Sequence, residues 1–138
     1  MIERTLTIFK PDSVSAARSG ALLARLEEEG FRVRGLKRLR LAPEQARAFY
    51  AVHKERPFFD GLVRFMTEGP VVVAALEREN AVAHLRKTMG ATDSKKAEPG
   101  TLRNLYGTDI ERNAIHGSDS PDNAAKEVAF FFSEAELV

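Results

Sequence analysis

The chain has 138 residues, of which 43% are hydrophobic, so it can bury one sizeable core and is expected to form a single domain over residues 1–138. Its 21 basic and 20 acidic residues nearly balance, so no net field favours nucleic acid, and a cationic site must arise from local clustering. The lack of cysteine excludes disulfides and thiolate chemistry; a charged N-terminus and short apolar runs favour a cytoplasmic protein without a membrane span.

The first part of the chain predicts a strand, a helix and a second strand. Residues 4–9 are rich in threonine and in branched or aromatic side chains, and this strand ends at Lys10, before a proline. Leucines at helical spacing follow in residues 19–29, with Ser19 as a cap and a glycine stop. Residues 31–41 alternate apolar and basic side chains, with a break near Gly35 that predicts a half-buried, bulged strand.

The middle of the chain predicts a helical pair and a strand–helix unit. One helix opens at Pro43 and another follows Pro57. Residues 71–76 are continuously apolar, as in a central strand, and Asn80 is expected to cap the next helix. Residues 90–113 show little periodicity and are interpreted as a long irregular ligand loop.

The C-terminal part predicts a short strand and a last helix. A brief apolar piece leads into His116, and Ser120-Pro121 opens a helix that runs to about Phe131. The order of elements fits the α+β class, as a ferredoxin-like βαββαβ sandwich with a four-stranded antiparallel sheet covered by helices. With helices on one face, the other face needs cover, so we expect a homo-oligomer.

Three histidines are candidates for chemistry. His53 and His84 lie in charged surroundings and are expected at the surface. His116 ends an apolar segment and is followed by a glycine, but local context alone leaves a structural role open. A neutral imidazole needs orientation more than activation to act as a nucleophile, and Glu127 on the last helix is the candidate for that role.

Phosphate binding would depend on side chains, because the sequence has neither a P-loop nor a kinase glycine loop. Arg86, Thr92 and Arg103 lie in or beside the irregular region, and Lys10 lies at a strand end. Guanidinium forks match phosphate oxygens, and a hydroxyl adds a donor. Each residue is weak evidence singly, so their value depends on their coming together in space.

The string NAIHGSDS at residues 113–120 closely resembles the signature N-x-x-H-G-S-D of nucleoside diphosphate kinases. The resemblance extends in family order over the whole chain, through the segments TLTIFKPD, RPFFDGLVRFM, GPVV, PGTLR and the closing ELV. It implies transfer of a terminal phosphoryl group from a nucleoside triphosphate such as ATP or GTP to a nucleoside diphosphate. The route would be ping-pong, through phosphorylated His116.

The resemblance also implies roles for individual residues. Ser118 and Glu127 would support His116, and Tyr50 would line the site beside it. The ribose contacts fall on Lys10 and Asn113, with Lys10 also reaching the transferred group, and the phosphate contacts fall on Arg86, Thr92 and Arg103. Phe58 and Ile110 would sandwich the base, with Leu62 nearby.

The family further implies Mg²⁺ held through nucleotide phosphates, with no metal ligands from the protein, and a hexamer or a tetramer. The chain departs from the family pattern after Thr92, where Asp93-Ser94 replaces asparagine-proline, which puts the rigidity of that loop in doubt. The short C-terminus is similar to that of bacterial members.

Two other classes of function remain open from the residues alone. A nucleotide-sensing module would bind ATP without forming a covalent phosphate, and a phosphohistidine relay would pass its label to a protein partner. Single-stranded nucleic acid binding by the arginines of residues 32–40 is a weaker alternative, because those residues alternate like a solvated strand face.

Overall fold

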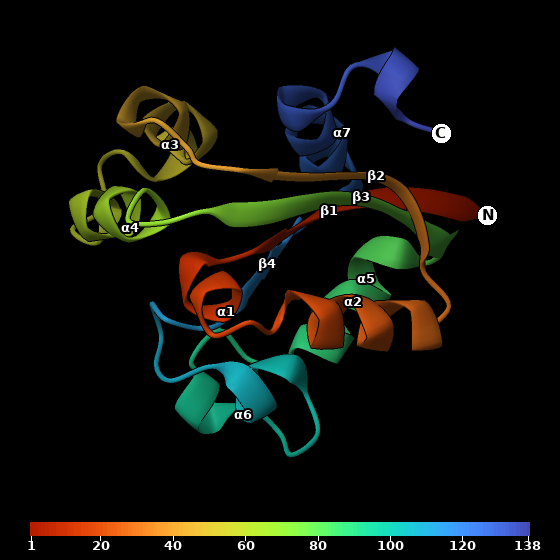
Figure 1. The fold of residues 1–138 in the computed structure, drawn as a ribbon, viewed down its shortest axis with the longest axis horizontal. Helices are drawn as coiled ribbons and strands as arrows, with labels where there is room; N and C mark the ends of the chain where they lie inside the picture. Colours follow the sequence, from red (N-terminus) through yellow and green to blue (C-terminus); the bar gives the residue numbers. More distant parts are fainter.

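A four-stranded antiparallel sheet in the order β2-β3-β1-β4 forms the centre of the molecule, in a computed structural model that describes all 138 residues (Figure 1). The strands are β1 (Ile2–Phe9), β2 (Arg32–Leu39), β3 (Val71–Glu79) and β4 (Ile115–Gly117). The predicted ferredoxin-like α+β class is confirmed.

Helices and short 3-10 turns fill the connections between the strands. In chain order they are α1 (Pro11–Ser15), α2 (Ser19–Glu28), α3 (Pro43–Phe49), η1 (Ala51–His53), α4 (Phe59–Met66), α5 (Ala81–Met89), η2 (Ser94–Lys96), α6 (Leu102–Tyr106), α7 (Pro121–Phe131) and η3 (Glu134–Glu136). None of these helices is both long and apolar enough to cross a bilayer.

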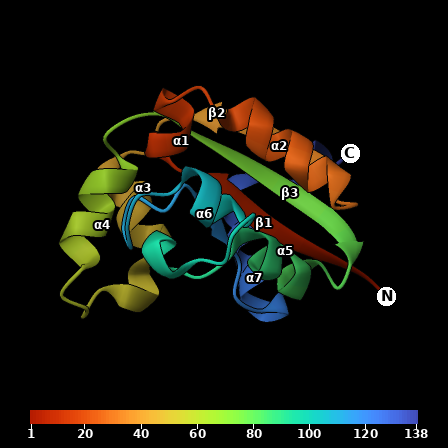
Figure 2. The same cartoon turned by 90° about the horizontal axis from the view of Figure 1, so that it is seen from below.

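The lower face of the sheet in Figure 1 is covered by α2, α5 and α6. Seen from below in Figure 2, α2 and α5 lie in front of β3 and β1. Their buried side chains, among them Leu22, Leu85 and Leu102, form one core with Phe9 and Leu76 of the strands. Each such fully buried aliphatic side chain stabilises the fold by about 1.5–3 kcal/mol.

The upper face is covered by α3, α4 and α7 of the same chain, so the expectation of a bare second face is wrong (Figure 1). Leu6, Ile8 and Val73 of the strands share a second core with Val63 of α4 and Val128 of α7. The position of α7 explains the error, because the last helix returns across the sheet from a strand of only three residues. Sheet coverage therefore gives no argument for oligomerisation.

The local predictions of a bulge near Gly35 and of a helix start at Ser120 are confirmed. The pairing of β2 with β3 shifts between Val33 and Gly35, which confirms the bulge. A Cβ at Gly35 would lie 2.8 Å from a ring carbon of Phe132, so the bulge lets the residue after α7 approach the strand closely. Ser120 caps α7 by accepting from the Asn123 backbone N–H at 3.1 Å.

Other local expectations failed. Asn80 precedes α5 with a φ of 55° and makes no side-chain cap, and Ser19 is the first residue of α2 instead of its cap. The helix α1 was not predicted, since five residues are too few to show periodicity. Residues 90–113 are not wholly irregular, because they contain η2 and α6.

Candidate active site

The short edge strand β4 places His116 beside the centre of the sheet. In the antiparallel pairing of β4 with β1, His116 lies opposite Ile8. The Thr7 hydroxyl donates to the His116 carbonyl at 2.8 Å, which adds a side-chain bond to a strand of three residues. The backbone that carries the imidazole is therefore held by the long first strand.

Glu127 of α7 orients the imidazole. Its Oε1 lies 2.7 Å from His116 Nε2 and also accepts from the Ser118 hydroxyl at 2.9 Å. The Ser118 Oγ in turn accepts from the Leu6 backbone N–H at 3.3 Å. Because a carboxylate only accepts hydrogen bonds, the proton of a neutral imidazole is on Nε2, and Nδ1 keeps its lone pair.

The surroundings keep that imidazole neutral. Burial lowers the pKa of His116 below 6.5, and the nearby charges of Lys10 and Arg103 act in the same direction, against an opposing effect of Glu127. The rings of Phe49 and Tyr50 pack edge-on against it, with centroids 5.4 and 6.2 Å away. The site thus presents an oriented, uncharged base at neutral pH.

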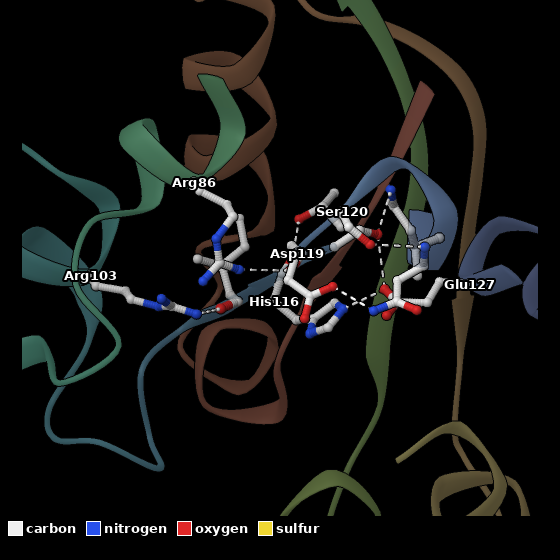
Figure 3. A network of polar contacts seen from close by, with 12 residues as sticks. Arg86, Arg103, His116, Asp119, Ser120 and Glu127 are labelled. Atoms are coloured by element: carbon white, nitrogen blue, oxygen red, sulfur yellow. Dashed lines mark hydrogen bonds and ion pairs between the residues drawn. The ribbon is translucent and has the colours of Figure 1, made fainter. Parts of the chain in front are cut away.

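Two arginines reach the backbone of β4. Arg103 is buried and donates to the carbonyls of Ile115 at 2.7 Å and Gly90 at 3.2 Å. Arg86 is exposed and donates to the Gly117 carbonyl at 3.4 Å. In Figure 3 both guanidinium groups approach β4 from one side and Glu127 from the other, with His116 between them. Burial, with the charge of Arg86, lowers the pKa of Arg103 to about 10.

Lys10 joins this region from the end of β1. Its Nζ donates to Asn113 Oδ1 at 2.7 Å, inside the molecule. Burial, followed by the charge of Arg103, lowers the pKa of Lys10 to about 8. The protonated ammonium is therefore less favourable in the free protein than in water, and a bound anion would raise the pKa of Lys10 again.

These cations lack the partners that buried charges normally have. Lys10 and Arg103 are the only buried basic side chains of the chain, and neither forms an ion pair with a carboxylate. Elsewhere Arg4 and Arg34 both bind Glu77, at 2.5 and 2.6 Å. A buried cation without a carboxylate is costly, so the arrangement suits an anionic ligand such as a phosphate chain.

The loop after α5 is tied to the same cluster through its backbone. Asn113 Nδ2 donates to the Thr92 carbonyl at 2.9 Å and to the Ile110 carbonyl at 3.2 Å. The Thr92 side chain is exposed and free for a ligand. Asp93 caps η2 by accepting from the Lys95 N–H at 3.1 Å.

The expected base-binding residues lie on two segments, with Phe58 and Leu62 at the start of and within α4 and Ile110 in residues 107–113. Phe58 and Ile110 are exposed, at 46% and 64%, and Leu62 is half-buried. The segments are bridged by the ion pair of Arg112 with Glu68 at 2.9 Å. Two large exposed apolar side chains beside a cationic cluster are suited to the faces of a nucleobase.

Sequence reasoning missed some contacts of His116. Phe49 was assigned no role in the site, although its neighbour Tyr50 was assigned to it. Thr7 gave no signal beyond strand propensity. His84 was expected at the surface but is half-buried, with Nε2 2.7 Å from Glu29 Oε1 and its ring 5.8 Å from that of Phe31. No group of three or more His, Asp or Glu residues is placed to bind a metal ion.

Comparisons with known proteins agree with this geometry. Residues 3–137 match the family model described as nucleoside diphosphate kinase. Proteins with that name from Acidiphilium cryptum and Persephonella marina are 57% and 51% identical to the chain. Each alignment covers 99% of this chain, with 97% and 98% of the respective relative.

Solved structures give the same result. The nucleoside diphosphate kinase of Aquifex aeolicus superposes with a TM-score of 0.98 at 48% identity, covering 100% of both chains. The enzyme of Halobacterium salinarum in complex with CDP gives 0.96 at 44% identity, covering 100% of this chain and 92% of the other. The chain therefore belongs to the nucleoside diphosphate kinase family, whose activity is phosphoryl transfer between nucleotides.

Proposed function

We propose that this protein moves the terminal phosphoryl group of a nucleoside triphosphate to a nucleoside diphosphate by way of His116, in a ping-pong reaction at one shared site. The observation that carries the proposal is the placement of the buried Lys10 and Arg103, neither of which forms an ion pair, beside an oriented neutral imidazole. Donor and acceptor share the α- and β-phosphates, so one cationic cluster could bind both in turn.

The reacting atom would be Nδ1 of His116. Its lone pair attacks the γ-phosphorus, an N–P bond forms, and the P–O bond to the leaving diphosphate breaks in line. The Nε2 proton stays on the ring and is donated to the Glu127 carboxylate, whose negative charge offsets the positive charge that develops on the imidazole. The acceptor's terminal oxygen then attacks the same phosphorus, and Nδ1 is the leaving group.

The remaining site residues would contact different parts of the nucleotide. Arg86, Thr92 and Arg103 would bind the phosphates, and Lys10 would bind the transferred group. Arginine forks match phosphate oxygens in pairs, so they stabilise charge that grows in the transition state.

The nucleoside would lie next to the phosphates. Lys10 and Asn113 would contact the ribose, and Phe58, Ile110 and Leu62 would enclose the base. Their apolar faces offer no hydrogen-bond code, which suits broad tolerance for the base. That the related enzyme of Halobacterium salinarum was solved in complex with CDP supports a nucleotide as the ligand.

A divalent metal, Mg²⁺ in our proposal, would arrive on the nucleotide. Mg²⁺ prefers oxygen ligands and commonly keeps substrate phosphates in its coordination, where it neutralises part of their charge. The protein's share would be the orientation of those phosphates by Arg86 and Arg103.

The chain would act as a single cytoplasmic domain that assembles into a hexamer, with a tetramer as the alternative. The proposal of assembly rests on family membership. Size-exclusion chromatography with light scattering tests it, and a protein that is monomeric at all concentrations would refute it.

The function is tested by a matched pair of histidine substitutions. His116→Gln should lower transfer from ATP to a second nucleoside diphosphate by at least about 10⁴-fold, as expected for loss of the nucleophile. His84→Gln removes the other glutamate-bonded imidazole and should leave transfer within about twofold, since the His84 side chain contacts Glu29 and Phe31 instead of the proposed site residues. Near wild-type transfer by His116→Gln would end the proposal, and a nucleotide sensor would show no transfer in either variant.

A further inference from the structure

The residue before β4 has an unusual backbone. Ala114 has a φ of 73°, although it is not glycine, and the Ile115 N–H donates to the Asn113 carbonyl at 2.9 Å. A three-residue turn with a positive φ at its centre matches the γ-turn of the strained kind, which is rare in proteins. Such a turn persists only where its surroundings hold it.

Residues 10–13 hold the turn. The Ala114 N–H donates to Asp12 Oδ2 at 3.1 Å, and the Ala114 carbonyl accepts from the Lys10 backbone N–H at 3.0 Å and from the Ser13 hydroxyl at 2.9 Å. Both backbone polar groups of Ala114 are thus bonded to one short segment at the start of α1. Asp12 supplies the only bond to the N–H.

The turn lies between two parts of the site. Asn113, just before it, is fixed by the Lys10 ammonium at 2.7 Å, and His116 follows two residues after it. A change in the peptide at Ala114 would move the amide of Asn113 and the imidazole of His116 together. Since a displacement of about 1 Å can cost a reaction about a hundredfold, the turn is a sensitive point.

From this geometry we infer that Asp12 is a positioning residue for phosphoryl transfer, which acts by holding the Ala114 turn through its Oδ2. The inference rests on the proposed role of His116. Asp12 touches neither the imidazole nor the phosphate-binding side chains in any hydrogen bond, so its effect is indirect.

The state of Asp12 supports this role. Burial raises the pKa of its carboxyl, and the hydrogen bond from the Ala114 N–H opposes that rise. The second oxygen, Oδ1, is buried without a partner. Burial disfavours the charged form of this carboxyl, so the hydrogen bond from the Ala114 N–H helps to keep it an acceptor.

The test compares three variants by the single-turnover rate of His116 phosphorylation at saturating ATP. Asp12→Ala should lower this rate by about 10–100-fold. Asp12→Asn keeps an oxygen that accepts from Ala114 and should stay within about threefold of wild type. Adding Ala114→Gly to Asp12→Ala should recover most of the loss, because glycine adopts a positive φ without strain.

Each outcome decides the inference. A wild-type rate for Asp12→Ala overturns it, and so do equal losses in the Ala and Asn variants, which would assign the effect to charge near Lys10 instead of the hydrogen bond. Failure of Ala114→Gly to rescue the rate also overturns it. Thermal unfolding tests whether each variant is folded at the assay temperature. If the Asp12→Ala protein is unfolded there, Ser13→Ala replaces it, and Ser15→Ala, at an exposed position, is its control.

With Ser13→Ala, the loss of one of two bonds to the Ala114 carbonyl should slow phosphorylation, whereas Ser15→Ala should not. The imidazole ¹⁵N resonances of His116 add a readout that general destabilisation does not move, and they should shift in Asp12→Ala but not in Asp12→Asn. If the wild-type protein formed no phosphohistidine, the proposed function would fail. If only the Asp12 comparison failed, that function would stand without this positioning residue.

Discussion

Two histidine–glutamate pairs in the molecule have the same distance and different surroundings. In both pairs the imidazole Nε2 lies 2.7 Å from a glutamate Oε1, in His116–Glu127 and in His84–Glu29. Glu29 is also bound by the Arg25 guanidinium at 3.1 Å, whereas Glu127 is bound by the Ser118 hydroxyl, and the cations near His116 have no carboxylate of their own. The difference teaches that the unpaired cations, more than the imidazole–carboxylate pair, distinguish an active site from a structural contact.

After loss of the nucleophile itself, the largest expected effect comes from removing the Arg103 guanidinium. Arg103→Gln should lower kcat/KM for nucleotide transfer by about 10³-fold, because a phosphate-binding guanidinium stabilises the transition state. Steady-state transfer between ATP and a second diphosphate measures this. Arg25→Gln, beside Glu29, serves as the control and should remain within about twofold, since its ion pair is at the surface. Comparable losses in both variants would remove the distinction between the pairs.

The next largest difference is expected between the effects of removing Glu127 and Glu29 on kcat. Glu127→Ala leaves the His116 ring without its orienting acceptor and should lower kcat by about 10²-fold, the usual range for a group that supports an acid–base or nucleophilic imidazole. Glu29→Ala should change kcat by less than about twofold, as is usual for surface substitutions. Parallel kcat and KM measurements decide, and a Glu127→Ala enzyme that retains full kcat would show that the imidazole needs no orientation.

The pH dependence of kcat/KM should also reflect the protonation of Lys10. The free protein loses the Lys10 proton near its pKa of about 8, so kcat/KM should fall above that pH, by up to about tenfold per pH unit. On the acidic side the lowered pKa of His116 keeps the nucleophile neutral below pH 6.5. Lys10→Arg stays charged and should shift the alkaline fall upward. An unchanged alkaline limb in that variant would contradict the assignment to Lys10.

The smallest effect concerns stability at the His84 pair. The pKa of Glu29 is lowered first by the hydrogen bond from His84, so the folded state favours the carboxylate. A depressed folded pKa contributes stability above the unfolded value of 4.5, and this contribution is lost as pH falls through the folded pKa. Urea unfolding of Glu29→Gln should show a loss of only about 0.5 kcal/mol at pH 7, as for a partly exposed pair, and a smaller loss as the pH is lowered below 4.5. A large loss that persisted at pH 3 would assign it to packing.

The sequence predicted the elements whose signals are local. The apolar run of β3, the break at Gly35 and the Ser120-Pro121 start of α7 each follow from a few neighbouring residues, and the structure has all three. Family resemblance then supplied the list of site residues. Those assignments came from matching motifs and used no distances between residues.

Other features depend on contacts far apart in the chain. The bond between Ser118 and Leu6 spans 112 residues, and the pairing of His116 with Glu127 depends on how α7 returns over the sheet. The turn at Ala114 gave no signal, because alanine does not favour a positive φ and only residues 10–13 stabilise it there. Helical cover of the second sheet face was missed for the same reason.

The most direct test of the central claim is the chemical state of His116 after brief incubation with γ-labelled ATP. The account predicts up to one acid-labile, alkali-stable phosphate per chain, on the peptide that contains His116, and its complete transfer to an added nucleoside diphosphate. Label on Ser118 in acid-stable form, or label on His116 that the diphosphate cannot remove, would contradict the account.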